Sequence, residues 1–264
     1  MAFLNPYADR LKEFSSFVLN DTDAHSLAQG WHKLFSARLG NPPAKLTLEI
    51  GCSNAEFLCA VAGRHPEIAF VGIDWKFKVV YKGAKRIHRE NLKNAMLVRG
   101  TAHDLEKIFG EGELDEIWIF FPDPWAKKGQ LKKRLMQESF LLAAHRALKK
   151  NGRIFFKTDH PGYFQWVLAL FGEPEPVLPE YSQATPVERS MRSRQIQVRR
   201  LEKDGLPAAN AAIQAAFRLE RYSTDYWGER TGRTVTPFSE TPTLFEQLFV
   251  KDGLPIYYVE LARR

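Results

Sequence analysis

The sequence predicts an α/β fold: a doubly wound, mostly parallel sheet of the Rossmann-like type. Between about residues 46 and 172, short apolar runs alternate with longer segments of helical period, and Gly, Pro, Asp or Asn bounds each run. Such alternation is typical of βαβ units, whose parallel strands are covered by helices on both faces. The predicted strands are Leu46–Ile50, Ala69–Ile73, Ala95–Val98, Leu114–Phe121 and Arg153–Phe156.

Helices are predicted between these strands, because the intervening segments carry apolar residues at helical spacing. They cover about 54–64, 76–93, 131–149 and 162–171, with a shorter turn at 104–109. A last apolar run, Ile256–Leu261, follows an Asp-Gly turn and is predicted to close the sheet as an edge strand.

The chain divides into three parts by composition. Residues 1–44 end at a Pro-Pro break and are predicted to be partly helical and mobile. Residues 45–172 and 241–264 form the sheet domain. Between them, 173–240 begins with a Pro-rich linker, continues through Arg-rich residues 189–203 and includes a helical stretch near 207–221. We interpret this segment as an inserted, partly helical lobe.

Composition limits the class of protein. The chain has 264 residues, 44% of them hydrophobic, which suits a sizeable core, and its net charge of +7 favours a polyanionic partner such as nucleic acid or a membrane surface. No apolar stretch is long enough to span a membrane, and the N-terminus has no signal-peptide pattern. Cys52 and Cys59 have no neighbours at metal-ligand spacing. We therefore expect a cytoplasmic protein with reduced cysteines, no metal and no membrane association.

Residues that follow the first three strands suggest a ligand site, because ligands of open α/β sheets bind beyond the carboxyl ends of the strands. Gly51 lets the backbone approach a ligand closely. Asp74 ends the second strand about 20 residues later, where an acid can accept from both ribose hydroxyls of an adenosine-containing ligand. Asp104 could accept from an adenine amino group. A plain turn at Gly51 and helix N-caps at Asp74 and Asp104 are the structural alternatives.

The fourth strand leads into the most informative segment, Pro122-Asp123-Pro124-Trp125. Two prolines fix the backbone around Asp123, and Trp125 offers a surface on which a base can stack. Cations follow at Lys127, Lys128, Lys132, Lys133 and Arg134. Asp159 adds a second carboxylate at the end of the next strand. A rigid acid, an aromatic ring and cations together predict a site for an extruded base of a polyanion.

These motifs, in order, resemble those of the bacterial tRNA (guanine-N7-)-methyltransferases, a class I family that uses S-adenosylmethionine. The resemblance covers about 46–170 and resumes at about 241–261, and its most specific part is the Pro-Asp-Pro-Trp segment with its basic continuation. The first loop has Ser53 and Ala55 where the family usually has glycine. The matching segments are Leu48–Gly51, Gly72–Asp74, Phe121–Trp125, Thr158–Asp159 and Thr243–Glu246.

The resemblance implies a Rossmann-like methyltransferase fold and methyl transfer from S-adenosylmethionine to guanine N7, at position 46 in the variable loop of tRNA. It places cofactor contacts at Glu49, Gly51, Asp74, Asp104 and Asp123, the last also being catalytic. It places substrate contacts at Lys127, Asp159, Thr243, Phe245 and Glu246, and RNA contacts at Lys128, Lys132, Lys133 and Arg134. We expect tRNA as the partner of a monomeric chain.

Two basic segments support an RNA partner. Residues 76–93 hold seven Lys/Arg against one acid, and a solvated helix face explains this equally well. For the Arg-rich segment 189–203 we predict a grip on tRNA phosphates through Arg192, Arg194 and Arg199.

Three other functions remain open at this point. The Pro-Asp-Pro-Trp segment also resembles the N/D-P-P-Y/F loop of enzymes that methylate exocyclic base amines. A nicotinamide-dependent dehydrogenase would use the same sheet, although G-x-G-x-x-G is absent. A non-enzymatic RNA-binding protein could have kept the fold and altered the first loop.

Overall fold

The protein is described from a computed structural model that covers residues 5–125, 128–176, 178, 206–229 and 236–264. Within these residues, one eight-stranded sheet has the order β1-β4-β3-β2-β5-β6-β8-β7. The strands from β1 to β6 pair in parallel, and β8 pairs antiparallel with both β6 and β7. The strands are β1 (Val18–Asn20), β2 (Lys45–Ile50), β3 (Ile68–Asp74), β4 (Ala95–Arg99), β5 (Leu114–Phe120), β6 (Leu148–Thr158), β7 (Phe217–Ser223) and β8 (Tyr257–Arg263).

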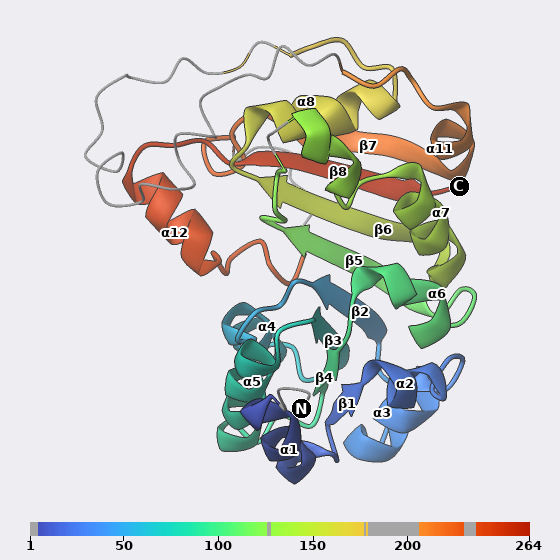
Figure 1. Ribbon diagram of the computed structural model, residues 1–264, viewed down its shortest axis with the longest axis vertical. Helices are drawn as coiled ribbons and strands as arrows, with labels where there is room; N and C mark the ends of the chain where they lie inside the picture. The colour runs from blue at the N-terminus through green and yellow to red at the C-terminus, as the bar shows by residue number, and fades with distance from the viewer. Residues whose placement is uncertain (1–4, 126–127, 177, 179–205, 230–235) are drawn as a thin grey trace.

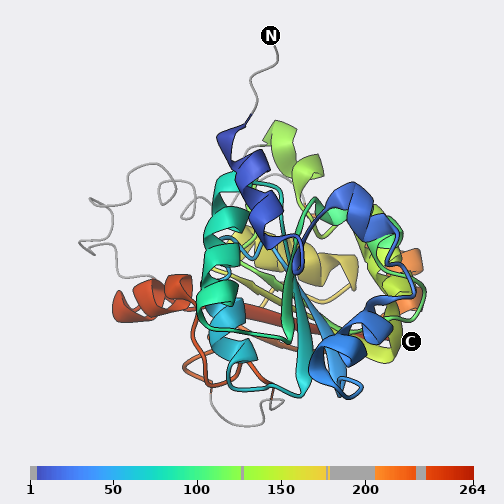
Figure 2. The ribbon, with the colours of Figure 1, turned by 90° about the horizontal axis from the view of Figure 1, so that it is seen from below.

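Helices cover both faces of the sheet (Figures 1 and 2). On one side α1 packs on α5, beside α4, and on the other side α6 contacts both α2 and α7. The helices are α1 (Pro6–Leu11), η1 (Lys12–Phe14), α2 (Asp21–His25), α3 (Trp31–Leu39), α4 (Glu56–Ala62), α5 (Phe77–Arg89), η2 (Ala102–Asp104), α6 (Leu105–Ile108), η3 (Lys128–Lys133), α7 (Glu138–Ala147), α8 (Pro161–Leu170), α11 (Ala211–Ala216) and α12 (Leu244–Lys251).

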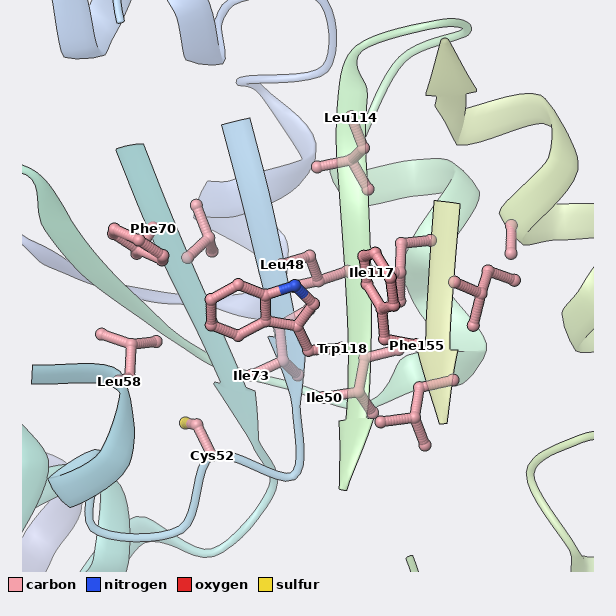
Figure 3. Close-up of a cluster of buried hydrophobic side chains, with 14 of the residues drawn as sticks. Leu48, Ile50, Cys52, Leu58, Phe70, Ile73, Leu114, Ile117, Trp118 and Phe155 are labelled. Carbon is pink, nitrogen blue, oxygen red and sulfur yellow. The ribbon is translucent and has the colours of Figure 1, made fainter. Parts of the chain in front are cut away.

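The core lies between the central strands and these helices, and Trp118 of β5 is at its centre (Figure 3). Trp118 is fully buried, and its ring packs on Phe70 and Phe238 with centroid separations of 5.6 and 5.1 Å. Its Nε1 donates to Glu116 Oε2 at 3.0 Å, so its polar group is satisfied inside the core. The central strands are therefore held rigidly, which fixes the loops at their carboxyl ends.

The predicted doubly wound α/β sheet is confirmed, and all five predicted parallel strands are present. Four of them have ends within one residue of the prediction, whereas β6 begins at Leu148 instead of Arg153 and ends at Thr158. The predicted edge position of the final strand is wrong. Its residues form β8, which lies between β6 and β7. Phe156 of β6 pairs with Val259 of β8, so apolar residues of the two strands lie side by side. The apolar pattern of residues 256–261 therefore identified a strand, but such a pattern cannot show which strands lie next to it.

The helical stretch expected near 207–221 is only half helical. It divides into α11 and the edge strand β7, which pairs with β8 from Phe217↔Arg263 to Ser223↔Tyr258. The sequence Phe217-Arg-Leu-Glu-Arg-Tyr-Ser alternates apolar and polar residues, the period of a half-buried strand, with one interruption at Glu220-Arg221, where the pairing register shifts. This part of 173–240 therefore belongs to the sheet domain, and the Arg-rich residues 189–203 lie outside the described part of the chain.

The N-terminal segment contributes a strand that the sequence did not predict. Residues of β1 pair with β4 from Val18↔Leu97 onward. The Glu113 carboxylate accepts from the backbone N–H of Gln29 and of Trp31, at 3.0 and 2.8 Å, and Trp31 is fully buried. Residues 18–39 are thus anchored to the sheet domain.

Candidate active site at the carboxyl edge of the sheet

Four of the predicted acids lie at or just beyond the carboxyl ends of adjacent strands, at the same edge of the sheet. The register pairs Ile50↔Ile73, Ile50↔Ile119 and Phe120↔Lys157 align the ends of β2, β3, β5 and β6. In this order the strand ends carry Glu49, Asp74, Asp123 and Asp159. The strand order reverses between β2 and β5, which is the position where such sheets bind ligands.

Glu49 is a buried carboxylate without compensation. Its side chain lies in β2, the residue is 7% exposed, and Oε2 is buried with no hydrogen-bond partner among the described residues. Burial, together with the negative charge of Asp74, raises the pKa of Glu49 to about 8. An unpartnered acid of this kind is a candidate for contact with a cationic or hydrogen-bond-donating ligand.

The first loop adopts a left-handed backbone at three positions. Gly51, Ser53 and Ala55 have φ of 78°, 51° and 52°, a region that costs residues with a Cβ about 1 kcal/mol or more. No atom lies within 4 Å of where a Cβ on Gly51 would stand, so the backbone there borders open space. A Cβ on Gly83 of α5 would approach the Ala55 Cβ to 3.0 Å, so loop and helix pack closely. Ser53 and Ala55 thus retain the loop shape that glycines would favour.

Asp74 orders this loop from the end of β3. Its Oδ2 accepts from Ser53 N at 3.1 Å, and its Oδ1 accepts from Lys76 N at 2.9 Å. The N-cap of α5 is Lys76, which makes no side-chain cap bond, so Asp74 is not the N-cap itself. Each carboxylate oxygen keeps acceptor capacity for a further donor such as a ribose hydroxyl.

Asp104 lies after β4 and is the N-cap of α6 by position, but its side chain makes no cap bond. Its Oδ1 instead accepts from Lys107 Nζ at 2.8 Å, and Thr101 Oγ1 donates to Oδ2 at 3.4 Å. Its hydrogen bond with Lys107 holds the pKa of Asp104 below the usual range, so the group stays an acceptor at neutral pH.

The Pro-Asp-Pro-Trp segment is bracketed by two strained residues. Phe121 and Trp125 have φ of 54° and 44°, which bulky side chains rarely adopt. The Arg134 Nε donates to Pro124 O at 2.8 Å, while its guanidinium lies over the Trp166 ring, 4.9 Å from the centroid. The loop is thus held in an unfavourable backbone conformation that leaves Asp123 exposed.

The basic residues predicted to contact RNA divide into two groups. Lys132 and Lys133 are exposed, and Lys133 Nζ lies 4.9 Å from the centroid of the Trp125 ring. Arg134 is only 4% exposed and supports the loop, so we leave it out of the RNA-contacting surface. Lys127 and the side chain of Lys128 lie outside the described part of the structure.

A buried ion pair joins β6 to the C-terminal helix. Lys157 Nζ donates to Glu246 Oε1 at 2.7 Å, and both side chains are fully buried. Trp227 Nε1 donates to the same oxygen at 3.1 Å, and Thr243 N donates to Oε2 at 2.7 Å. Both oxygens of Glu246 therefore hold bonds within the protein, where the sequence suggested contact with a base.

The Thr243–Glu246 element begins α12, which lies on the side toward which β5 and β6 point (Figure 1). Thr243 and Glu246 form a reciprocal capping box, since the Thr243 Oγ1 accepts from Glu246 N at 3.2 Å. Phe245 is 39% exposed, and its ring centroid lies 5.6 Å from that of Phe121. Phe245 thus both reaches solvent and touches Phe121, which directly precedes the Pro-Asp-Pro-Trp segment.

Sequence reasoning missed Lys157 and its aromatic surroundings. The cation lies 4.0 Å from the Tyr226 ring centroid and 4.8 Å from that of Phe120, and the backbone oxygen of Lys157 accepts from Phe121 N at 2.8 Å. Lys157 thus connects the Asp123 loop with α12. A lysine directly after the apolar run Ile154–Phe156 was a signal for a buried pair, but its partner lies 89 residues away in sequence.

Comparison with known proteins agrees with this geometry. The family model described as "Putative methyltransferase" matches residues 43–203. A tRNA (guanine-N(7)-)-methyltransferase of Bacillus cytotoxicus is 34% identical over 169 residues, which cover 64% of this chain and 75% of the relative. The chain belongs to the tRNA (guanine-N7-)-methyltransferase family. A bifunctional glycosyltransferase/methyltransferase of Fusobacterium nucleatum is 31% identical over 63% of this chain, and the match spans 25% of that longer protein.

Solved structures show the same fold. The 16S rRNA methyltransferase KamB aligns over 88% of this chain and 93% of its own, with 12% identity and a TM-score of 0.50. An antibiotic-related methyltransferase aligns over 88% and 94%, with 14% identity and the same TM-score. Both confirm the predicted Rossmann-like methyltransferase fold.

The described residues contain no helix long and apolar enough to cross a membrane. Over the same residues, no group of three or more His, Cys, Asp or Glu side chains has the arrangement of a metal site.

Proposed function

We propose that this protein transfers a methyl group from S-adenosylmethionine to N7 of a guanine in tRNA, and that it acts in the cytoplasm, where such a tRNA is modified. The 34% identity to a tRNA (guanine-N(7)-)-methyltransferase carries the proposal. The site supports it independently, since four acids lie at or just beyond the carboxyl ends of adjacent strands, at the ligand-binding edge of a methyltransferase fold.

The ends of β2, β3 and β4 fit the cofactor. Asp74 would accept from the ribose hydroxyls, Asp104 from the adenine amino group, and the backbone at Gly51 leaves room for close approach. Glu49, with its unpartnered Oε2, would face the positively charged methionine portion. When bound, the cofactor supplies an electrophilic methyl group on a sulfonium.

Guanine N7 has a free lone pair and no proton, so its attack on that methyl group requires no general base. A C–N bond forms as the S–CH₃ bond breaks, and the positive charge moves from sulfur to the purine. The protein's main task is to position the guanine in line with the methyl group, which can supply much of the rate.

Exposed Asp123 and half-buried Asp159 would stabilise the charge that develops on the purine and accept from its N1–H and amino group. In this proposal Asp123 also contacts the cofactor and is the catalytic residue. Phe245 would pack on the base. Thr243 and Glu246, already engaged in the capping box and the buried pair, would hold Phe245 in place. Lys127, Lys128, Lys132 and Lys133 remain proposed contacts to the substrate and the RNA.

The test is methyl transfer from labelled S-adenosylmethionine to unmodified tRNA, followed by digestion and identification of the labelled nucleoside. The proposal expects 7-methylguanosine. A methylated exocyclic amine would instead support the second function suggested by the Pro-Asp-Pro-Trp loop. Binding of tRNA without transfer would support a non-enzymatic RNA-binding protein.

A further inference from the structure

The outer face of α5 carries a row of cations. α5 packs on the sheet through Val80, Ala84 and Ile87. On the opposite face lie residues spaced three or four apart, which share one side of a helix. We call this face the α5 stripe; its members are exposed and comprise Lys78, Lys82, Lys85 and Arg89.

The α5 stripe contains no acid. Arg89 pairs with Glu90 at 2.8 Å, but within the described residues Lys78, Lys82 and Lys85 form no ion pair. Ordinary solvated helix faces gain stability from Glu–Lys pairs at i,i+4, whereas like charges at that spacing cost roughly 0.2–0.5 kcal/mol per pair. Three of the four cations of the stripe therefore have no ion-pair partner in the described part of the chain.

The carboxylate bonded at the start of α5, that of Asp74, precedes the helix and belongs to the proposed cofactor site, and the helix itself begins without an acid. Its N-cap is Lys76, with no side-chain cap bond, and its first turn contains no acid although a helix N-terminus favours negative charge. Departures from local stability rules are expected where a surface serves function. Together with the acid-free stripe, they indicate an external polyanion.

The stripe also starts at the proposed active site. Lys76 N donates to Asp74 Oδ1, and the neighbouring Trp75 is 62% exposed, with Lys76 Nζ lying 5.3 Å from the centroid of its ring. Successive members, three or four residues apart, rise about 4.5–6 Å along the helix, so the cations form one continuous row. We propose that the α5 stripe binds the phosphate backbone of the tRNA and guides it away from the site, an inference that rests on the proposed function.

The test compares two variants with the same loss of charge. Lys82→Gln/Lys85→Gln removes two cations from the stripe. Lys33→Gln/Lys150→Gln removes two exposed lysines, one on α3 and one near the start of β6, at the amino edge of the sheet. Fluorescence anisotropy with labelled unmodified tRNA is measured over a series of salt concentrations for both variants and the unmodified protein.

The stripe variant is expected to bind tRNA about tenfold more weakly at low salt. Its plot of log K against log salt should be shallower by about 1.5, since each lost phosphate contact removes about 0.7–0.9 from the slope. In methyl-transfer assays its KM for tRNA should rise while kcat is retained, because the lost contacts bind substrate and transition state equally. The amino-edge variant should match the unmodified protein within about twofold.

Equal affinity and slope for the two variants would overturn the inference while leaving the proposed function intact. The same binding measurement with vesicles that contain phosphatidylserine provides a second test. If the stripe variant binds these vesicles more weakly but binds tRNA as well as the unmodified protein does, the partner is a membrane and the inference is overturned. If the unmodified protein neither binds nor methylates tRNA, the proposed function itself fails, and the two failures are thereby distinguished.

Discussion

Glu49 and Glu246 are both buried glutamates at the carboxyl edge of the sheet, and they differ in what surrounds them. Glu246 is fully buried, yet Lys157, Trp227 and the Thr243 N–H all donate to its oxygens. Glu49 is 7% exposed and leaves one oxygen without a partner. The comparison teaches that burial alone does not mark a functional acid. The compensated glutamate holds the architecture of the site, and the uncompensated one is available to a ligand.

Breaking the compensated pair should have the largest effect. Lys157→Met would leave the Glu246 charge buried without its cation, and such losses typically cost about 3–5 kcal/mol of the free energy of unfolding. Urea unfolding monitored by circular dichroism would measure it. Lys150→Met, an exposed lysine of the same strand, is the matched control and should cost under about 0.5 kcal/mol. If the two variants lost similar amounts of unfolding free energy, the Lys157–Glu246 pair would not be what holds α12 against β6.

Neutralising the uncompensated glutamate, Glu49, should raise the free energy of unfolding, whereas breaking the compensated pair lowers it. The pKa of Glu49 is about 8 in the folded protein and near 4.3 when unfolded, so the folded state binds more protons between these values. The contribution of Glu49 to stability therefore falls as pH rises from about 4.3 to about 8, and is constant above that.

We thus expect Glu49→Gln to be more stable than the unmodified protein at pH 8.5 by up to about 5 kcal/mol, the limit set by a pKa difference of about 3.7 units at about 1.4 kcal/mol each, and nearly equal to it at pH 4.5. The same variant should bind S-adenosylmethionine more weakly. Melting curves at both pH values test the expected change in stability, and calorimetric titration with S-adenosylmethionine tests the expected change in affinity. Parallel stability–pH curves would mean that Glu49 is compensated after all.

Asp123 is a third kind of acid, exposed rather than buried. Asp123→Asn should lower kcat by about 10²-fold, the typical effect of removing one electrostatic contact to a transition state. Its stability should change by less than about 0.5 kcal/mol, because the side chain is not packed in the core. Near-full turnover by a folded variant would remove Asp123 from the catalytic role.

The smallest effect is expected in the loop beside Glu49. Ser53 is exposed with φ of 51°, so Ser53→Gly should relieve backbone strain and raise the free energy of unfolding by about 0.5–1 kcal/mol. Ala55 has a similar φ but is fully buried against α5, so Ala55→Gly should gain less. Chemical denaturation of both variants provides the measurement, and equal gains would mean that the packing of Ala55 contributes nothing.

The sequence predicted the sheet, and it predicted that the candidate acids share one edge of that sheet, because both depend on local patterns. Apolar runs bounded by turn residues gave β2 to β6, and acids at strand ends gave Asp74 and Asp123. The missed features depend on contacts between distant segments. The Lys157–Glu246 pair joins residues 89 positions apart, and β8 inserts between β6 and β7 because of pairing that periodicity does not encode. The burial of Arg134 likewise results from packing on Tyr163 and Trp166.

The central claim, that N7 of a guanine is the methyl acceptor, has a direct test. The methyl-transfer assay would use tRNA in which guanosine is replaced by 7-deazaguanosine, which has a carbon in place of N7 and keeps the exocyclic amine. Our account predicts that transfer is lost although the substituted tRNA still binds. Transfer at an undiminished rate would contradict it and place the methyl group on another atom.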